Sequence, residues 1–298
     1  MIDIISKTKY FFVVAVIFVV AGCFSAKTLA QNSSDAIAIR IIPNPNHYSA
    51  LRWYKESDFN GSPQSTTVDG YEAVRDGRTV YVNAGNVQNG NLYTYIYLIS
   101  YNQGADSKTM DIFSSILARW KFNTNLNSSA NCSVSTATEC LLDTDCQLAE
   151  YCLSEKAEII RDTKRMADLA EVKANLEKYE EKNAHYPNMR AGSYLRNITI
   201  STWPSWQKVL EQELAVSLPV DPINKLGNCG NSRFNPITCW DKNAKEFADR
   251  IPANNVLDLP DNSRVFVYTT NSDGTNYDLC AFMESVYAAY AETGICAN

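Results

Sequence analysis

Cysteine and aspartate side chains gather in one loop of the chain at a spacing that suggests metal chemistry. Residues 217–247, SLPVDPINKLGNCGNSRFNPITCWDKNAKEF, contain Asp221, Cys229, Cys239 and Asp241. Zinc sites are usually built from closely spaced Cys and His pairs. The chain has no Cys-x-x-Cys step and only two His residues, which lie far apart. The spacing therefore favours a short loop closed by a Cys229–Cys239 disulfide, whose role is shape.

The other cysteines support the same interpretation. The chain has nine, and with Cys23 set aside an even number remains: Cys132, Cys140, Cys146, Cys152, Cys229, Cys239, Cys280 and Cys296. An even set in an exported chain is typical of disulfides. We expect these eight to be paired within local groups, although the spacing does not fix the connectivity.

Four of these cysteines lie in residues 126–153, which are expected to form a Cys-rich linker loop. The segment is rich in Ser, Thr, Asn and Asp, so cross-links rather than a core must hold it. Asp143 and Asp145 alternate as Ca²⁺ ligands do, but the Gly and the distal Glu of an EF-hand loop are missing. We expect solvated acids and no cofactor, with Ca²⁺ as the alternative.

The first 30 residues have the pattern of an export signal. Two lysines precede the apolar run FFVVAVIFVVAG, which is too short to span a bilayer. The step VAGC resembles the bacterial lipobox, in which Cys23 is lipidated. Cleavage after TLA, before Gln31, and an uncleaved membrane anchor are the alternatives. All three place the rest of the chain in an extracytoplasmic location.

Composition and periodicity predict an α+β protein of two domains. The 298 residues carry a net charge of −6 with scattered cations, which argues against nucleic acid as a partner. Residues 36–125 form a strand-rich α+β domain, because AIAIRIIP, RTVYVNA and NLYTYIYLISYN have strand character. A helix follows in SKTMDIFSSILARWKF, with an expected buried face of Ile112, Phe113, Ile116, Leu117 and Trp120.

Residues 154–298 are expected to form the second domain. Ser154 is a candidate N-cap for a long amphipathic helix that ends near Asn183. Its apolar residues fall on one stripe, and its charged residues are expected to form a solvated face. Further along the chain, NSRVFVYTTNSDGTNYDLCAFMES predicts a hairpin around an Asp-Gly turn, and VYAAYAETGIC predicts a short helix.

Three segments of this second domain, in order, resemble the globular domain of type IV pilins and type II secretion pseudopilins. They are RDTKRMADLAEVKANLEKYEEKNAHYP, LPVDP and VFVYTTNSDGTNYDLCAFME, so the resemblance covers about residues 155–285. It implies a long helix packed on a small antiparallel sheet. A signal and a separate domain precede this helix, so the resemblance implies a pilin-like head and not a pilus subunit. The N-terminal half resembles no family that we recognise.

The same resemblance raises a second Ca²⁺ candidate. Some pseudopilin heads bind Ca²⁺ near their terminal strands, and the nearest carboxylates here are Asp273 and Asp278. Asp273 lies in an Asp-Gly turn and Asp278 in a predicted strand. Turn chemistry accounts for the first and strand surface for the second.

No catalytic motif of a hydrolase or nucleotide-binding enzyme occurs in the sequence. We therefore predict a non-catalytic protein. The alternative enzyme is a cell-wall or glycan hydrolase that uses Asp69, Glu72 and Asp76 as acid and base. A third interpretation is carbohydrate binding through exposed tyrosines, because Tyr93 and Tyr95, together with Tyr97, lie on one face of a predicted strand.

Together these patterns predict an exported bacterial cell-surface protein with a structural, assembly or attachment role. The expected role is related to type IV pilin or type II secretion systems. The expected partners are the membrane, through the N-terminal anchor or lipid, and other surface proteins or glycans.

Overall fold

The computed structural model describes residues 35–126, 128–190, 194–236, 238–248, 259–288 and 295–297. The predicted export signal and Cys23 lie outside these residues. Residues from Asp35 onward group as one compact unit. Within the described residues, no helix is long and apolar enough to cross a membrane.

The first part of the chain forms a five-stranded antiparallel sheet, in the spatial order β1-β5-β4-β3-β2. Two helices interrupt the strands, α1 before β2 and α2 after β5. The elements are β1 (Ile37–Pro43), α1 (Ala50–Glu56), β2 (Gln64–Val68), β3 (Tyr71–Asp76), β4 (Thr79–Gln88), β5 (Asn91–Tyr101) and α2 (Ser107–Arg119).

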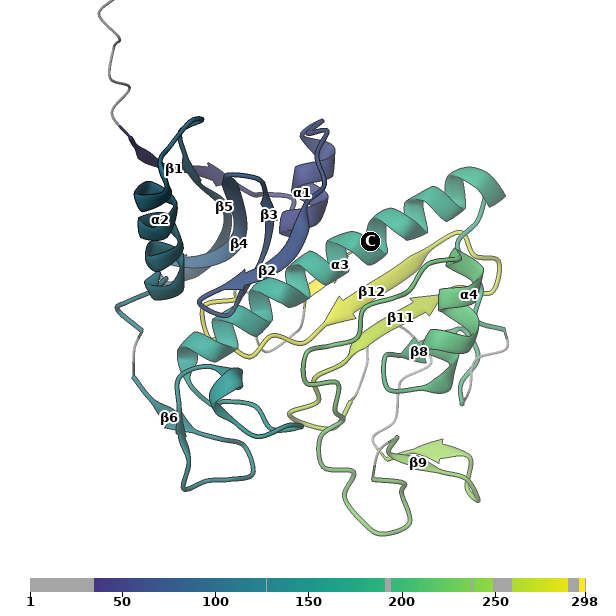
Figure 1. Cartoon of the computed structure of the whole chain (residues 1–298). Coiled ribbons are helices and arrows are strands. Elements are labelled where there is room, and N and C mark those ends of the chain that lie inside the picture. The colour runs from purple at the N-terminus through teal and green to yellow at the C-terminus, as the bar shows by residue number, and fades with distance from the viewer. Residues whose placement is uncertain are drawn as a thin grey trace, which may run out of the picture. The chain divides into compact units, whose positions relative to one another are not determined.

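The two helices cover opposite faces of this sheet (Figure 1). On one face, Tyr54 of α1 packs with Val74, Tyr81 and Ile96. On the other, Phe113 of α2 packs with a cluster that includes Ile99. Apolar residues at both odd and even strand positions are buried in β4 for this reason.

Residues 128–153 contain little regular structure. Two short strands, β6 (Ala130–Asn131) and β7 (Glu139–Cys140), pair with each other, and η1 (Asp143–Asp145) is a 3₁₀ turn. The segment leads to Ser154, whose hydroxyl accepts a hydrogen bond from Ala157 N at 3.1 Å. Ser154 is therefore the N-cap of the long helix, as predicted.

The long helix α3 (Glu155–Asn183) lies along a second antiparallel sheet (Figure 1). This sheet has the order β13-β12-β11-β8. Its strands are β8 (Ile198–Ile200), β11 (Phe266–Thr270), β12 (Tyr277–Ala281) and β13 (Ile295–Ala297). The connecting elements are η2 (Trp206–Leu210, a short π-helix), α4 (Glu211–Leu214), β9 (Trp240–Asp241) and β10 (Glu246–Phe247).

Helix α3 is buried on more than one side. Ile159 belongs to the core under the first sheet, whereas Met166, Leu169 and Leu176 belong to the core of the second. The helix therefore packs against both sheets. The predicted mixed α and β architecture with a strand-rich N-terminal part, a long helix and disulfides is confirmed.

Several local predictions need correction. Ile112 is 55% exposed, so the buried face of α2 is narrower than its periodicity suggests. The long helix ends at Asn183 as predicted, and the residue that follows it, Ala184, has the left-handed conformation. The helix predicted near the C-terminus falls partly on residues 289–294, outside the described residues, and residues 295–297 form β13 instead.

Candidate functional site

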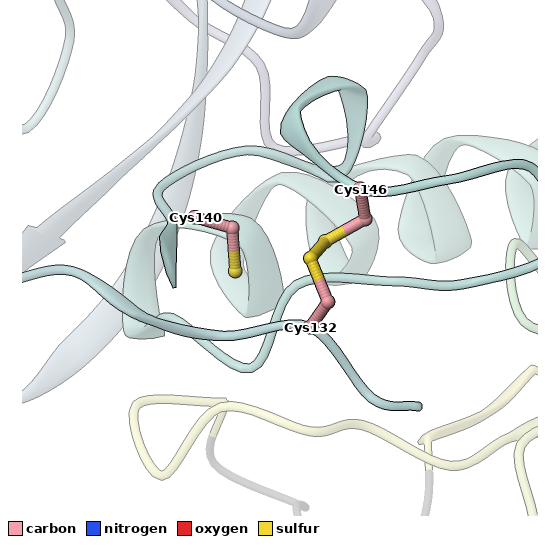
Figure 2. A group of neighbouring side chains, drawn as sticks. All are labelled: Cys132, Cys140 and Cys146. Atoms are coloured by element: carbon pink, nitrogen blue, oxygen red, sulfur yellow. A yellow bond between two sulfur atoms is a disulfide. The ribbon is translucent and has the colours of Figure 1, made fainter. Parts of the chain in front are cut away.

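The eight cysteines form four disulfides, which confirms their prediction as a disulfide set. The pairs are Cys132–Cys146, Cys140–Cys152, Cys229–Cys239 and Cys280–Cys296. The disulfide between Cys132 and Cys146 lies beside Cys140 in the Cys-rich segment (Figure 2). Four disulfides indicate an oxidising, extracytoplasmic environment.

The same cysteines are also the tightest group of potential metal ligands. In the described part of the chain, Cys132, Cys140 and Cys146 are the one group of three or more such residues with ligand atoms within 4.8 Å of one another. Zinc binding requires thiolates, and here each sulfur is bonded to another sulfur. In this oxidised form the cluster is a cross-link.

The acids considered as Ca²⁺ ligands are hydrogen-bonded within the protein. Asp143 Oδ1 accepts from Cys152 N at 2.9 Å and contacts Arg161 Nη1 at 2.5 Å. Asp145 Oδ2 accepts from the backbone of Leu141 and Leu142, both at 2.9 Å. These two carboxylates therefore organise the segment before α3, and Asp143 connects it to a helix cation.

The second pair of Ca²⁺ candidates lies at the β11–β12 hairpin. Asp273 Oδ1 accepts from the backbone and the hydroxyl of Thr275, and these hydrogen bonds lower the pKa of Asp273. Asp278 Oδ2 lies 3.3 Å from Thr269 Oγ1 across the strand pair. The two aspartates therefore have separate local roles in the hairpin.

The most extensive polar cluster was not predicted. It lies where α3 passes between the two sheets, and we call it the ion-pair network: Arg161, Asp162, Arg165, Asp221 and Glu284. Arg165, Asp162 and Asp221 have fully buried side chains. The charged residues of this half of α3 are thus not the solvated face that the sequence suggested.

Arg165 is at the centre of the ion-pair network. Its Nε and Nη2 donate to Asp221 at 2.6 and 3.0 Å, and its Nη1 donates to Asp162 at 2.8 Å and to Glu284 at 2.5 Å. Arg161 adds a bidentate pair with Glu284, at 2.8 and 2.6 Å. The guanidinium fork suits such two-point contacts with carboxylates.

The ion-pair network holds two guanidinium groups among three carboxylates. Burial alone would raise the pKa of Glu284, but the guanidinium groups of Arg161 and Arg165 hold that pKa below its ordinary value. Burial raises the pKa of Asp162, although Arg165 and the backbone N–H groups of Glu284 and Ser285 oppose the shift. The network connects α3 to the Asp-Pro turn and to the segment after β12, so its chemistry is structural.

A cavity of about 150 Å³ adjoins the ion-pair network. Glu72 of β3 and Lys164 of α3 line it, and Lys164 Nζ donates to Glu72 Oε1 at 2.8 Å and to Asp168 Oδ1 at 3.0 Å. The second oxygen of Asp168 is buried without a hydrogen-bond partner. Burial raises the pKa of Asp168 to about 7, although Lys164 opposes the shift. Sequence reasoning missed this residue.

The three carboxylates of the hydrolase alternative have different partners. Asp69 contacts Lys156 at 2.7 Å and Lys121 at 3.0 Å. Glu72 contacts Lys164 as described above, and Asp76 Oδ2 accepts from Tyr54 Oη at 2.6 Å. Of the three, only Glu72 lines the cavity.

Asp69 forms an ion pair with Lys156 that is shielded from solvent. The side chains of Asp69 and Lys156 are both fully buried, and Asp69 Oδ2 also accepts from Phe122 N at 2.8 Å. A cation and an anion held together out of solvent neutralise each other. Asp69 therefore joins the β2–β3 turn to the first turn of α3.

The predicted tyrosine surface is only partly open. Tyr97 packs edge-on against Phe122, while Tyr95 is half-buried and Tyr93 is 46% exposed. On the neighbouring strand β1, Ile39 and Ile41 are 51% and 54% exposed. These residues, with Pro43, define an open sheet surface: Ile39, Ile41, Pro43, Tyr93 and Tyr95.

The two histidines have hydrogen-bond and packing contacts within the protein. His47 Nδ1 lies 2.9 Å from Thr94 Oγ1, and burial lowers the pKa of His47. His185 Nδ1 lies 2.9 Å from its neighbour's carbonyl, and its ring packs against Tyr179. Both contacts are consistent with packing roles.

Comparison with known proteins finds no family model, no curated protein and no solved structure that matches this chain.

Proposed function

We propose that the protein is a non-catalytic, exported bacterial cell-surface protein with a structural, assembly or attachment role. One observation carries the proposal. The candidate acids and histidines have structural partners, whereas the open sheet surface around Ile39 and Tyr93 leaves apolar and aromatic side chains in contact with solvent. A contiguous exposed patch of apolar side chains is typical of surfaces that bind partners.

Two further features support this proposal. The four disulfides fit a life outside the cytoplasm. A long helix lying on a small antiparallel sheet supports a pilin-like second half, and hence a role related to pilin or type II secretion assemblies. Anchoring through Cys23, or through the apolar N-terminal run, would keep the folded part at the surface.

The test expresses the full chain and the Cys23→Ser variant in a bacterial host. We expect the native protein outside the cytoplasm, with its eight cysteines between Cys132 and Cys296 oxidised. Mass spectrometry of the mature N-terminus distinguishes a lipid on Cys23 from cleavage before Gln31 and from an intact anchor. A reduced protein that stays in the cytosol would contradict the proposal.

The enzymatic alternative has its own test. The purified protein is incubated with peptidoglycan and with soluble polysaccharides, next to Asp76→Ala and Glu72→Gln variants. We expect no turnover by any of the three proteins. Turnover by the wild type that either substitution abolishes would replace the proposed function with that of a hydrolase.

A further inference from the structure

Among the residues that the structure describes, strand β1 pairs with another strand on one side and not on the other. It is the edge strand of the first sheet, and its neighbour there is β5. Asn102 N donates to Ala36 O at 3.1 Å, and Asn44 N donates to Thr94 O at 3.0 Å. Since backbone groups alternate in direction along an antiparallel strand, the N–H and C=O groups of Ile37, Ile39 and Ile41 point away from β5.

The side chains of β1 are equally open. Ile39 and Ile41 are more than half exposed, and register places them opposite Ile99 and Tyr97. Residues directly opposite in an antiparallel pair point to the same face, so these isoleucines lie on the face that α2 covers further along. An unpaired backbone row beside exposed isoleucines is a template for another strand.

The other edge of the same sheet lacks these properties. Strand β2 has the sequence QSTTV, and its first four side chains are exposed and polar. In β1, the single charged residue, Arg40, pairs with Leu98 and therefore points to the opposite face from Ile39. Of the two edges of this sheet, as the structure describes it, the β1 edge is the one that combines unpaired backbone groups with exposed apolar side chains.

We infer that β1 binds the β1 strand of a second copy of this chain, with the two strands antiparallel about Ile39. In this register Ile39 lies opposite its own copy, and Ile37 lies opposite Ile41 of the other protomer. Arg40 then lies opposite Ala38. A shift that placed Ile39 opposite Ile41 would put the two Arg40 side chains face to face, and like charges in that position are destabilising.

The inferred pairing is isologous, as expected of a two-fold dimer. It also brings α2 of one protomer towards the partner strand. Thr109 Oγ1 donates to Asp35 Oδ2 at 2.6 Å, so the first turn of α2 lies beside the start of β1. Met110 is 41% exposed at this end, where Ile37 meets Ile41 of the other copy.

The first test measures mass in solution with the mature, oxidised protein over a concentration series. A contact of one short strand is small for a stable complex, so we expect a dimer that forms as concentration rises. Ile39→Lys places two cations opposite each other and should leave a monomer with an unchanged melting temperature. The matched control is Thr66→Lys at an exposed position of β2, which should dimerise like the wild type.

The second test determines the register by cross-linking. Opposed residues of a hydrogen-bonded antiparallel pair have Cα atoms about 5.5 Å apart, which is within the range of a disulfide. Ile39→Cys should therefore give a covalent dimer under mild oxidation, and Arg40→Cys should not. Peptide mapping verifies that the four native disulfides remain in both variants.

Three results would overturn the inference. One is a wild-type protein that stays monomeric up to its solubility limit. Another is a dimer that Ile39→Lys does not weaken, or in which Arg40→Cys cross-links instead of Ile39→Cys. The third is a monomer that binds a glycan array and loses that binding on Tyr95→Ala, because the open sheet surface would then serve a carbohydrate. A monomeric protein that is still exported would leave the proposed function standing.

Discussion

Arg165 and Asp221 form a bidentate pair in which neither side chain is exposed to solvent. The pair joins α3 to the Asp-Pro step, 56 residues further along the chain. Asp221 Oδ1 also accepts from Ile223 N at 2.9 Å, so the same carboxylate shapes the turn that follows it. The Asp221 carboxylate therefore fixes the position of α3 and also the direction of the chain after the Asp-Pro turn.

Replacing Arg165 should destabilise the protein strongly. Arg165→Met removes the cation that faces Asp162, Asp221 and Glu284; Glu284 keeps Arg161, but the buried carboxylates of Asp162 and Asp221 lose their guanidinium partner. Removing one partner of a buried ion pair costs about 3–5 kcal/mol. Urea unfolding of the oxidised protein, followed by circular dichroism, measures this change in the free energy of unfolding.

The control for Arg165 is an arginine with an exposed ion pair. Arg233 Nη2 contacts Glu246 at 2.6 Å, but both side chains are about half exposed. Arg233→Met should change the free energy of unfolding by less than about 1 kcal/mol. Equal losses for the two variants would show that the ion-pair network does not hold α3 in place.

The elements that follow from local patterns were predicted well. Strands β1 and β5 come from alternation, α2 and α3 from helical spacing, and the β11–β12 hairpin from its Asp-Gly turn. The cysteine count alone predicted a disulfide set. Each of these signals depends on residues close together in the sequence.

The ion-pair network could not be predicted in the same way. Arg165 and Glu284 are 119 residues apart, and a charged residue on an amphipathic helix usually faces water. Arg165 is buried because α3 packs between two sheets, which no local pattern reports. The same limit applies to Asp69 and Asp76, which closeness in the sequence placed together as candidate catalytic acids. The fold gives them different partners, Lys156 and Tyr54.

Asp168 should make the stability depend on pH. Burial raises its pKa in the folded protein to about 7, from an ordinary value of 3.8. A raised carboxyl pKa favours the protonated form in the folded state, so its stabilising contribution is present at low pH and is lost as the pH rises towards 7. Asp168→Asn, which stays neutral, should therefore gain stability relative to the wild type between pH 4 and pH 8.

The expected gain is roughly 2–4 kcal/mol, because one pKa unit corresponds to about 1.4 kcal/mol. Guanidinium unfolding of both proteins at each pH gives the difference, which cancels other titrating groups. A carbon-13 titration of the Asp168 carboxyl reports its pKa directly. A difference that stays constant across this range would contradict the prediction.

The Cys140–Cys152 disulfide should stabilise the start of α3. It closes a segment of 12 residues, and Cys152 O accepts from Arg161 Nη1 at 3.0 Å. The double variant Cys140→Ser, Cys152→Ser should lose about 2–4 kcal/mol, with faster amide exchange in the first turns of α3. The matched double variant at Cys229 and Cys239 should leave that exchange unchanged, and acceleration there in both variants would refute the local coupling.

The hydrogen bond between Tyr54 and Asp76 should depend on Gly61. The pKa of Tyr54 is raised to about 12, first by the hydrogen bond to Asp76 and second by the burial of the Tyr54 hydroxyl. A Cβ at Gly61 would collide with Asp76 Oδ2 and Tyr54 Oη, so Gly61→Ala should separate the two groups and cost about 1–3 kcal/mol by overpacking.

Asp76→Asn, which has no such collision, tests the charge alone. Ultraviolet titration should show one tyrosine ionising at lower pH in both variants, and Tyr54→Phe should remove that step. A titration curve identical to the wild type in Gly61→Ala would show that the pair tolerates the added methyl group.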